Sequence, residues 1–179
     1  MTVQNKGYNR TSIFIHWLVA LIIIGLFSSG YWMVELNYYS PWYKSAPFWH
    51  KSVGIVLLAL MLFRVSWRGL KGAPKPLTSH SKTVQLASSM THLALYILIF
   101  TILCSGYLIS TADNRPIEVF GWFEVPSLGE LFTEQADRAG LVHQFGAYSL
   151  IALAALHALA ALKHHFFDKD DTLKRMLKP

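Results

Sequence analysis

The sequence is poor in cysteine and in charge. Cys104 is the single cysteine, so no disulfide can form within the chain and a disulfide-stabilised scaffold is excluded. Charged residues make up 15% of the chain and hydrophobic residues 53%. A soluble domain of 179 residues would have more apolar surface than it could bury. The composition therefore predicts one membrane domain over residues 1–179.

Four segments are candidates for membrane-spanning helices, because about 20 apolar residues cross the roughly 30 Å of hydrocarbon. The predicted spans are approximately 13–34, 47–67, 84–110 and 141–162. Only helices satisfy their own backbone groups in lipid at this hydropathy, so we predict an all-α four-helix membrane bundle. The second span also fits a buried core helix, because its uninterrupted apolar part is only Val53–Phe63.

A secretory signal is an alternative for the first segment. Lys6 and Arg10 precede it, and Ser28-Ser29-Gly30 resembles a cleavage site. However, its 22 uncharged residues exceed the about 7 to 15 of a signal core, which favours a membrane span.

Basic residues collect on one side of this topology. The other side holds seven of the ten acids, with Lys44, Arg115, Arg138 and Lys51. By the positive-inside rule we expect a protein of the bacterial cytoplasmic membrane with both termini in the cytoplasm, and this accounts for most of the +6 charge without a nucleic-acid partner. In the long outer connection, residues 118–126 include three aromatic residues, Phe120, Trp122 and Phe123, which fit a short segment at the membrane surface. The eleven basic residues predicted inside are Lys6, Arg10, Arg68, Lys71, Lys75, Lys82, Lys163, Lys169, Lys174, Arg175 and Lys178.

Four histidines lie within the predicted spans. His143 and His157 are fourteen residues apart, so they share one helix face about 21 Å apart. Because alternate spans run in opposite directions, His16 is expected at the depth of His157 and His50 at the depth of His143. A histidine inside a span is costly enough to indicate function, and two pairs at two depths indicate a ligand at each.

Haem iron fits these pairs best. No carboxylate lies inside a span to complete a zinc site, and the Cys-X-X-Cys-His motif for covalent haem is absent. Two facing imidazoles match the axial ligands of iron in a b haem. Small residues such as Gly54 and Gly146, near His50 and His143, leave room for a flat ring. We therefore predict two b haems, with metal ligand pairs His16/His157 and His50/His143.

Further basic residues and histidines have more than one interpretation. Arg64 is expected level with the inner pair, where it either binds a haem propionate or extends to the membrane surface. His92 begins the third span and either bonds a propionate or quinone or marks the interface. His80 is expected in a solvated loop. His164 and His165 are alternatives to His157 as inner ligand, but they follow Lys163 at the interface.

The segments "SIFIHWLVALIII" and "FWHKSVGIVLLALMLFRVSWR" and the tail "LVHQFGAYSLIALAALHALAALKHHFFDKDDTLKRM" resemble the bacterial cytochrome b561 family. The resemblance covers nearly the whole chain and implies the same two histidine pairs as haem ligands. It also implies an electron carrier of the cytoplasmic membrane that works with quinone. Some members are taken to oxidise superoxide, and Lys51 and Arg138 flank the outer pair, where they could steer an anion.

Two further functions stay open. The chain could be a cytochrome b anchor subunit that accepts electrons from a periplasmic dehydrogenase or hydrogenase, or a small transporter with histidine proton relays. With both axial positions filled, a haem favours electron transfer over oxygen activation. The leading hypothesis is therefore an oxidoreductase or electron carrier between an outer donor, superoxide or a redox protein, and quinone, embedded in membrane lipid.

Overall fold

The computed structural model describes residues 7–72 and 74–179. This part of the chain contains four long helices: α1 (Arg10–Met33), α2 (Ser45–Lys71), α3 (Lys82–Thr111) and α4 (Gln135–Phe166). Each is long and apolar enough to cross a membrane, so the predicted all-α four-span fold is confirmed. Lys6, one of the basic residues predicted inside, lies outside the described residues.

The helices extend beyond the predicted spans at most of their ends. Polar side chains cap the N-terminal ends of α1 and α3, before the apolar runs begin. The side chain of Asn9 accepts a hydrogen bond from the Ser12 amide at 2.9 Å at the start of α1, and Ser81 caps α3 through the Val84 amide at 3.3 Å. Gly72 ends α2 with a φ of 71°, which a glycine adopts without strain.

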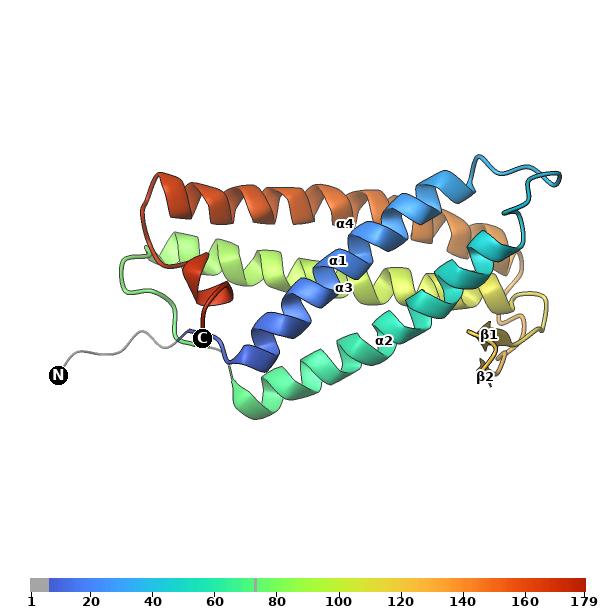
Figure 1. The fold of residues 1–179 in the computed structure, drawn as a ribbon, viewed down its shortest axis with the longest axis horizontal. Coiled ribbons are helices and arrows are strands. Elements are labelled where there is room, and N and C mark those ends of the chain that lie inside the picture. The colour runs from blue at the N-terminus through green and yellow to red at the C-terminus, as the bar shows by residue number, and fades with distance from the viewer. Residues whose placement is uncertain (1–6, 73) are drawn as a thin grey trace.

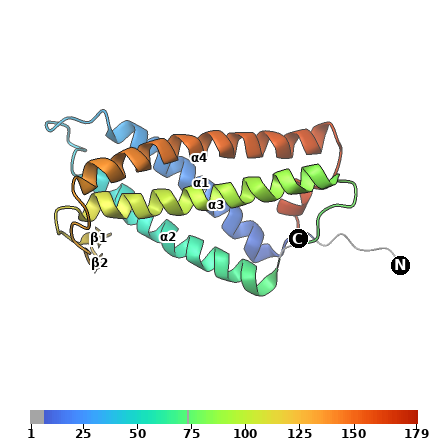
Figure 2. The ribbon, with the colours of Figure 1, turned by 180° about the vertical axis from the view of Figure 1, so that it is seen from behind.

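The helices associate as two antiparallel pairs. α3 and α4 lie side by side, and α1 packs mainly on α2 (Figures 1 and 2). The contact between α1 and α4 is much smaller. The pairs meet in a central cluster of buried side chains: Ile15, Val19, Leu57, Met61, Ile99 and Leu150.

A short β-hairpin covers the N-terminal end of α2, at the end of the bundle that the sequence predicts to be outer. We call this end of the bundle outer and the opposite end inner. Strand β1 (Ile117–Val119) pairs antiparallel with β2 (Phe123–Val125). Ile117 and Val119 are buried, whereas Trp122 is 82% exposed. The hydroxyl of Ser52, on α2, accepts the Phe120 amide at 3.1 Å and anchors the turn. The aromatic segment predicted at the membrane surface is thus a hairpin attached to α2, with Trp122 pointing outward.

The C-terminal tail folds back under the inner end of the bundle (Figure 1). Its short 3-10 helix η1 (Lys174–Met176) lies near the start of α1. The indole Nε1 of Trp17 donates to the carbonyl of Met176 at 2.8 Å, and the Tyr8 amide donates to the carbonyl of Arg175 at 3.2 Å. The tail therefore joins the α1 end of the bundle to the α4 end.

Candidate functional site

The structure brings together both predicted histidine pairs. The ring centroids of His50 and His143 are 6.3 Å apart, and those of His16 and His157 are also 6.3 Å apart. Each pair joins the α1–α2 side of the bundle to α4, with one pair near the outer ends of the helices and the other towards the inner ends. The structure thus places side by side the histidines that the sequence paired.

This separation fits two imidazoles that share one metal ion. An imidazole nitrogen binds a first-row metal at about 2 Å and the ring centre lies roughly 1 Å further back, so the two centroids should be about 6 Å apart. The rings of the outer pair are inclined by 66° and those of the inner pair by 79°. The donor set, neutral imidazole on both sides in an apolar surrounding, suits haem iron.

Two Ser-Gly dipeptides seat the outer histidines. A Cβ atom on Gly30 of α1 would lie 3.2 Å from Cε1 of His50, and one on Gly106 of α3 would lie 3.0 Å from Cε1 of His143. A larger residue at either position would push the imidazole away. These two glycines were not among the residues predicted from the sequence. The pattern that could have indicated them is the repeat of Ser-Gly near the outer ends of the first and third spans.

The serine of each dipeptide contacts the Nδ1 atom of an outer histidine. Ser29 Oγ lies 3.1 Å from His50 Nδ1 and also donates to the Leu26 carbonyl at 3.1 Å. Because the hydroxyl has a single proton, its oxygen accepts from His50 Nδ1–H. On α4, His143 Nδ1 donates to the carbonyl of Ile102 at 2.9 Å. Both outer rings then carry their proton on Nδ1, and Nε2 has a free lone pair for a metal.

Ser105 supplies a second, longer contact to the same nitrogen of His143. Its hydroxyl lies 3.3 Å from His143 Nδ1 and donates to the Ile102 carbonyl at 3.0 Å. His143 therefore has two oxygen acceptors at Nδ1, whereas His50 has Ser29 alone among the described hydrogen bonds.

The inner pair has other hydrogen-bond partners than the outer pair. Arg64 donates from Nη2 to His16 Nδ1 at 3.1 Å and from Nε to the Tyr96 hydroxyl at 3.0 Å. The guanidinium is half-buried and points into the bundle. The sequence left two interpretations of Arg64. In the structure its side chain contacts His16 and Tyr96 and does not extend towards the membrane surface.

A third histidine stands beside the inner pair. The ring of His92 lies 5.3 Å from that of His157, closer than His16 does. From the sequence, His92 was expected at the inner end without a partner of its own. Its ring is inclined by 66° to that of His157, so the inner end holds three neighbouring imidazoles among the described residues.

Three other histidines lie away from both pairs. The prediction that His80 is solvated is wrong, because its side chain is 15% exposed and bonds Asp170 at 2.8 Å. His164 bonds the same carboxylate at 2.8 Å, so it does not face His16. His165 has a buried Nδ1 with no hydrogen-bond partner among the described residues. In the described structure His157 is the α4 residue that faces His16.

Small residues near the histidines behave differently from one another. Beside Gly54 there is open space, as a flat ring would require. Gly146 instead lets α3 approach α4, because a Cβ there would lie 3.0 Å from Cγ1 of Ile102. The room predicted beside Gly146 is therefore filled by a side chain.

The family model of prokaryotic cytochrome b561 matches residues 7–179. The chain is 52% identical to cytochrome b561 homolog 2 of Escherichia coli (strain K12), over 96% of this chain and 92% of the relative. The chain belongs to the prokaryotic cytochrome b561 family. It is also 31% identical to a Yersinia pestis protein named "Probable superoxide oxidase CybB", over 97% of both chains. A third relative, cytochrome b562 of Cereibacter sphaeroides, is 30% identical over 98% of both chains.

Membership of the cytochrome b561 family makes this chain a membrane cytochrome b. The family is one of four-helix bundles that bind haem b for electron transport, in agreement with the fold and with the imidazole pairs. The predicted family, fold and cofactor type are therefore confirmed.

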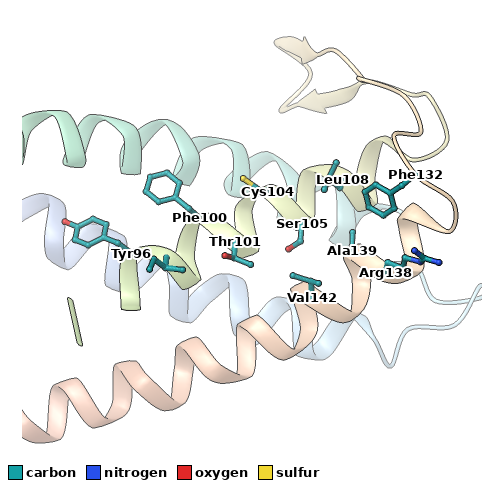
Figure 3. A pocket seen from close by; sticks show the side chains of 11 residues that line it. Tyr96, Phe100, Thr101, Cys104, Ser105, Leu108, Phe132, Arg138, Ala139 and Val142 are labelled. Carbon is teal, nitrogen blue, oxygen red and sulfur yellow. The ribbon is translucent and has the colours of Figure 1, made fainter. Parts of the chain in front are cut away.

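Two open grooves lie near the outer histidine pair. One, of about 510 Å³, is lined by His50, Ser29 and three tryptophans. The other, of about 640 Å³, runs between α3 and α4 and has Arg138 at one end (Figure 3). Ser105, which contacts His143, lies in its wall, but His143 itself does not line it. Both volumes are in the range of small-molecule sites, and the first groove is the one that includes a histidine of the pair.

Proposed function

We propose that this cytochrome transfers electrons between a donor at the outer face and the quinone pool, through two b haems held by His50/His143 and His16/His157. The observation that carries the proposal is the equal 6.3 Å separation of the two imidazole pairs, one in each half of the bundle. When bound, haem b supplies one-electron transfer between ferric and ferrous iron.

The residues of this chain set up that chemistry. His50 and His143 present Nε2 because Ser29 and the Ile102 carbonyl accept the protons on Nδ1. His16 can present its Nε2 in the same way once Arg64 releases its Nδ1. The freed guanidinium is then available to a propionate, with Tyr96 as its fixed partner.

The charge distribution supports an orientation with both termini in the cytoplasm of a bacterial inner membrane. The chain ends, the α2–α3 connection and the C-terminal tail share one end of the bundle, and this end carries most of the lysines and arginines (Figure 1). The hairpin and the long α3–α4 connection then lie on the periplasmic side.

Superoxide is the donor that we propose first, and the name of the Yersinia pestis relative supports it. Oxidation of superoxide to dioxygen releases one electron, so two superoxide ions with two protons reduce one quinone to quinol. Lys51, adjacent to His50, is the basic side chain placed to attract the anion, because Arg138 is already paired with Glu134 at 3.2 Å.

Haem stoichiometry and a coupled assay test the proposal. The purified, full-length protein should contain two haems per chain by pyridine haemochrome. It should also reduce a water-soluble quinone when superoxide is generated enzymatically, with superoxide dismutase as the control. One haem per chain, or quinone reduction that the cytochrome does not accelerate, would contradict it. A large partner that copurifies in equal amounts would instead favour the anchor-subunit function.

A further inference from the structure

Two histidines and an aspartate from three separate segments converge at the inner end of the bundle. His80 lies in the connection between α2 and α3, His164 near the end of α4, and Asp170 in the C-terminal tail. One potential ligand atom from each lies within 4.8 Å of the others. None of the three belongs to the imidazole pairs described above.

The three groups point at a common centre. His80 Nε2 and His164 Nδ1 both lie 2.8 Å from the same oxygen, Oδ2 of Asp170. The ring centroids of the two histidines are 4.7 Å apart. Atoms that bind one tetrahedral zinc at 2.0–2.1 Å are about 3.3 Å apart. Each N–O distance would therefore lengthen by roughly half an ångström on metal binding, and the two nitrogens, which lie within 4.8 Å of each other, would come to about the same 3.3 Å separation.

The cluster is both ordered and shielded. The other carboxylate oxygen of Asp170 accepts the Thr172 amide at 2.8 Å, which fixes the carboxylate plane. The three side chains are between 12% and 18% exposed. Burial raises the pKa of the Asp170 carboxyl, but hydrogen bonds from Thr172, His80 and His164 outweigh it and hold that pKa well below its usual value. The carboxylate is therefore ionised at neutral pH, as a metal ligand must be.

We propose that His80, His164 and Asp170 form a binding site for a divalent transition metal of the zinc class. Imidazole and carboxylate donors in a three-ligand set with one open position suit zinc, whereas magnesium and calcium prefer oxygen ligands alone. Each histidine binds with the nitrogen that now faces Asp170, and its proton moves to the other ring nitrogen. Asp168 is a less suitable fourth ligand, because Lys163 binds its two oxygens at 2.7 and 2.9 Å.

Such a metal would cross-link three segments of the chain next to the inner imidazole pair. His164 follows His157 by seven residues, which places the two on one face of α4 about 10 Å apart. The tail that carries Asp170 also contacts Trp17, the residue after His16. The ion would therefore fasten the inner end of the bundle without touching the haem ligands, and the proposal does not depend on the electron donor or the quinone.

Zinc binding by the purified, tag-free full-length protein tests this site. The protein, with its haem in place, is equilibrated with micromolar zinc and its metal content is measured after gel filtration. We expect about one zinc per chain, and X-ray absorption at the zinc edge with nitrogen and oxygen neighbours at about 2.0 Å that include imidazole. The bound ion should also raise the midpoint of thermal unfolding, because it binds the folded state.

Two matched variants decide the ligands. Asp170→Asn keeps the shape of the side chain but removes the charged carboxylate ligand. It should weaken zinc binding at least about 100-fold, since loss of a group that only hydrogen-bonds to a metal ligand already costs roughly 10 to 100-fold. Asp171→Asn removes an exposed neighbour that pairs with Lys174 and should bind zinc as the unaltered protein does. His80→Ala should behave as Asp170→Asn does.

The haem spectrum of each variant reports whether the bundle is folded. Absence of zinc from the unaltered protein would overturn the proposal. The three side chains would then form a hydrogen-bonded cluster without a metal. Equal zinc content in Asp170→Asn and Asp171→Asn would overturn it as well. Failure of the haem assignments would leave the zinc result unchanged, because the two sites share no residue.

Discussion

His50 of α2 and His143 of α4 face each other with their ring centroids 6.3 Å apart. In the sequence, most of α2 and all of α3 lie between them. The same separation recurs between His16 and His157 at the inner end. A bundle in which α4 supplies one imidazole to each pair has a single helix common to both pairs. This arrangement makes the two sites separable by mutation on one helix.

Substitution of one α4 histidine should remove one haem and spare the other. His143→Ala leaves His50 without a partner, and His157→Ala does the same to His16, so each variant should contain about one haem per chain instead of two. Pyridine haemochrome and redox titration measure the number and the midpoint potentials, and the two variants should retain different potentials. Loss of both haems from a variant that is still monodisperse would contradict the pairing.

The serine contacts should differ in their importance. Ser29 is the acceptor described for His50 Nδ1, whereas His143 keeps the Ile102 carbonyl when Ser105 is removed. We expect Ser29→Ala to weaken retention of the outer haem roughly 10-fold, as loss of an outer-shell contact does, and Ser105→Ala to have a smaller effect. Haem transfer to apomyoglobin measures retention. An equal or reversed order would show that the serines do not orient the rings.

A methyl group at Gly106 should displace His143. The added Cβ would lie 3.0 Å from Cε1 and 3.3 Å from Nδ1 of that ring, so Gly106→Ala should lose most of the outer haem. Gly69→Ala is the control, because its Cβ would meet nothing within 4 Å. That control should keep both haems and gain up to about 1 kcal/mol of helix stability. Absorption spectra compare the two; an unchanged spectrum of Gly106→Ala would refute the seating role.

Arg64 should influence the inner haem alone. Its guanidinium lies 3.1 Å from His16 Nδ1, and removal of a cation near the iron should lower the midpoint potential of that haem. We expect Arg64→Leu to lower the inner potential and Arg64→Lys to restore most of it, because the lysine keeps the charge but not the two-pronged hydrogen bonding. Redox titration in the His143→Ala background isolates the inner haem. An unchanged inner potential in that background would contradict this assignment.

Lys51 should govern the reaction with superoxide if electrostatic attraction brings the anion to the outer pair. Lys51→Glu should reduce the second-order rate with superoxide several-fold at low ionic strength, and the difference should shrink as salt is added. Arg115→Glu is a matched charge reversal in the outer connection, at a residue already paired with Asp113 at 3.2 Å. Stopped-flow absorption gives both rates. Equal rates for the two variants would argue against steering by Lys51.

The sequence identified the family and the membrane fold, because long uncharged runs leave few alternatives to helices in lipid. It also gave the partner of each of the four histidines, since the direction of each span fixes the depth of every residue along it. It could not find the seats of the outer rings. Ser29 and Gly30 lie on a different helix from His50, and their role depends on how close α1 comes to α2.

The contacts at the inner end of the molecule could not be predicted from the sequence either. The sequence indicated a solvated loop at His80 and a basic C-terminal tail, but neither pattern says that the loop and the tail are in contact. Ninety residues separate His80 from Asp170, and the two meet because the tail turns back beneath the bundle and bonds α1. Hydropathy and helical periodicity therefore predicted which residues lie at the same level along neighbouring helices. Which side chains touch across helices and loops was decided only by tertiary packing, because such contacts depend on helix rotation, close approach at glycine and the path of a polar tail, none of which has a periodic signal.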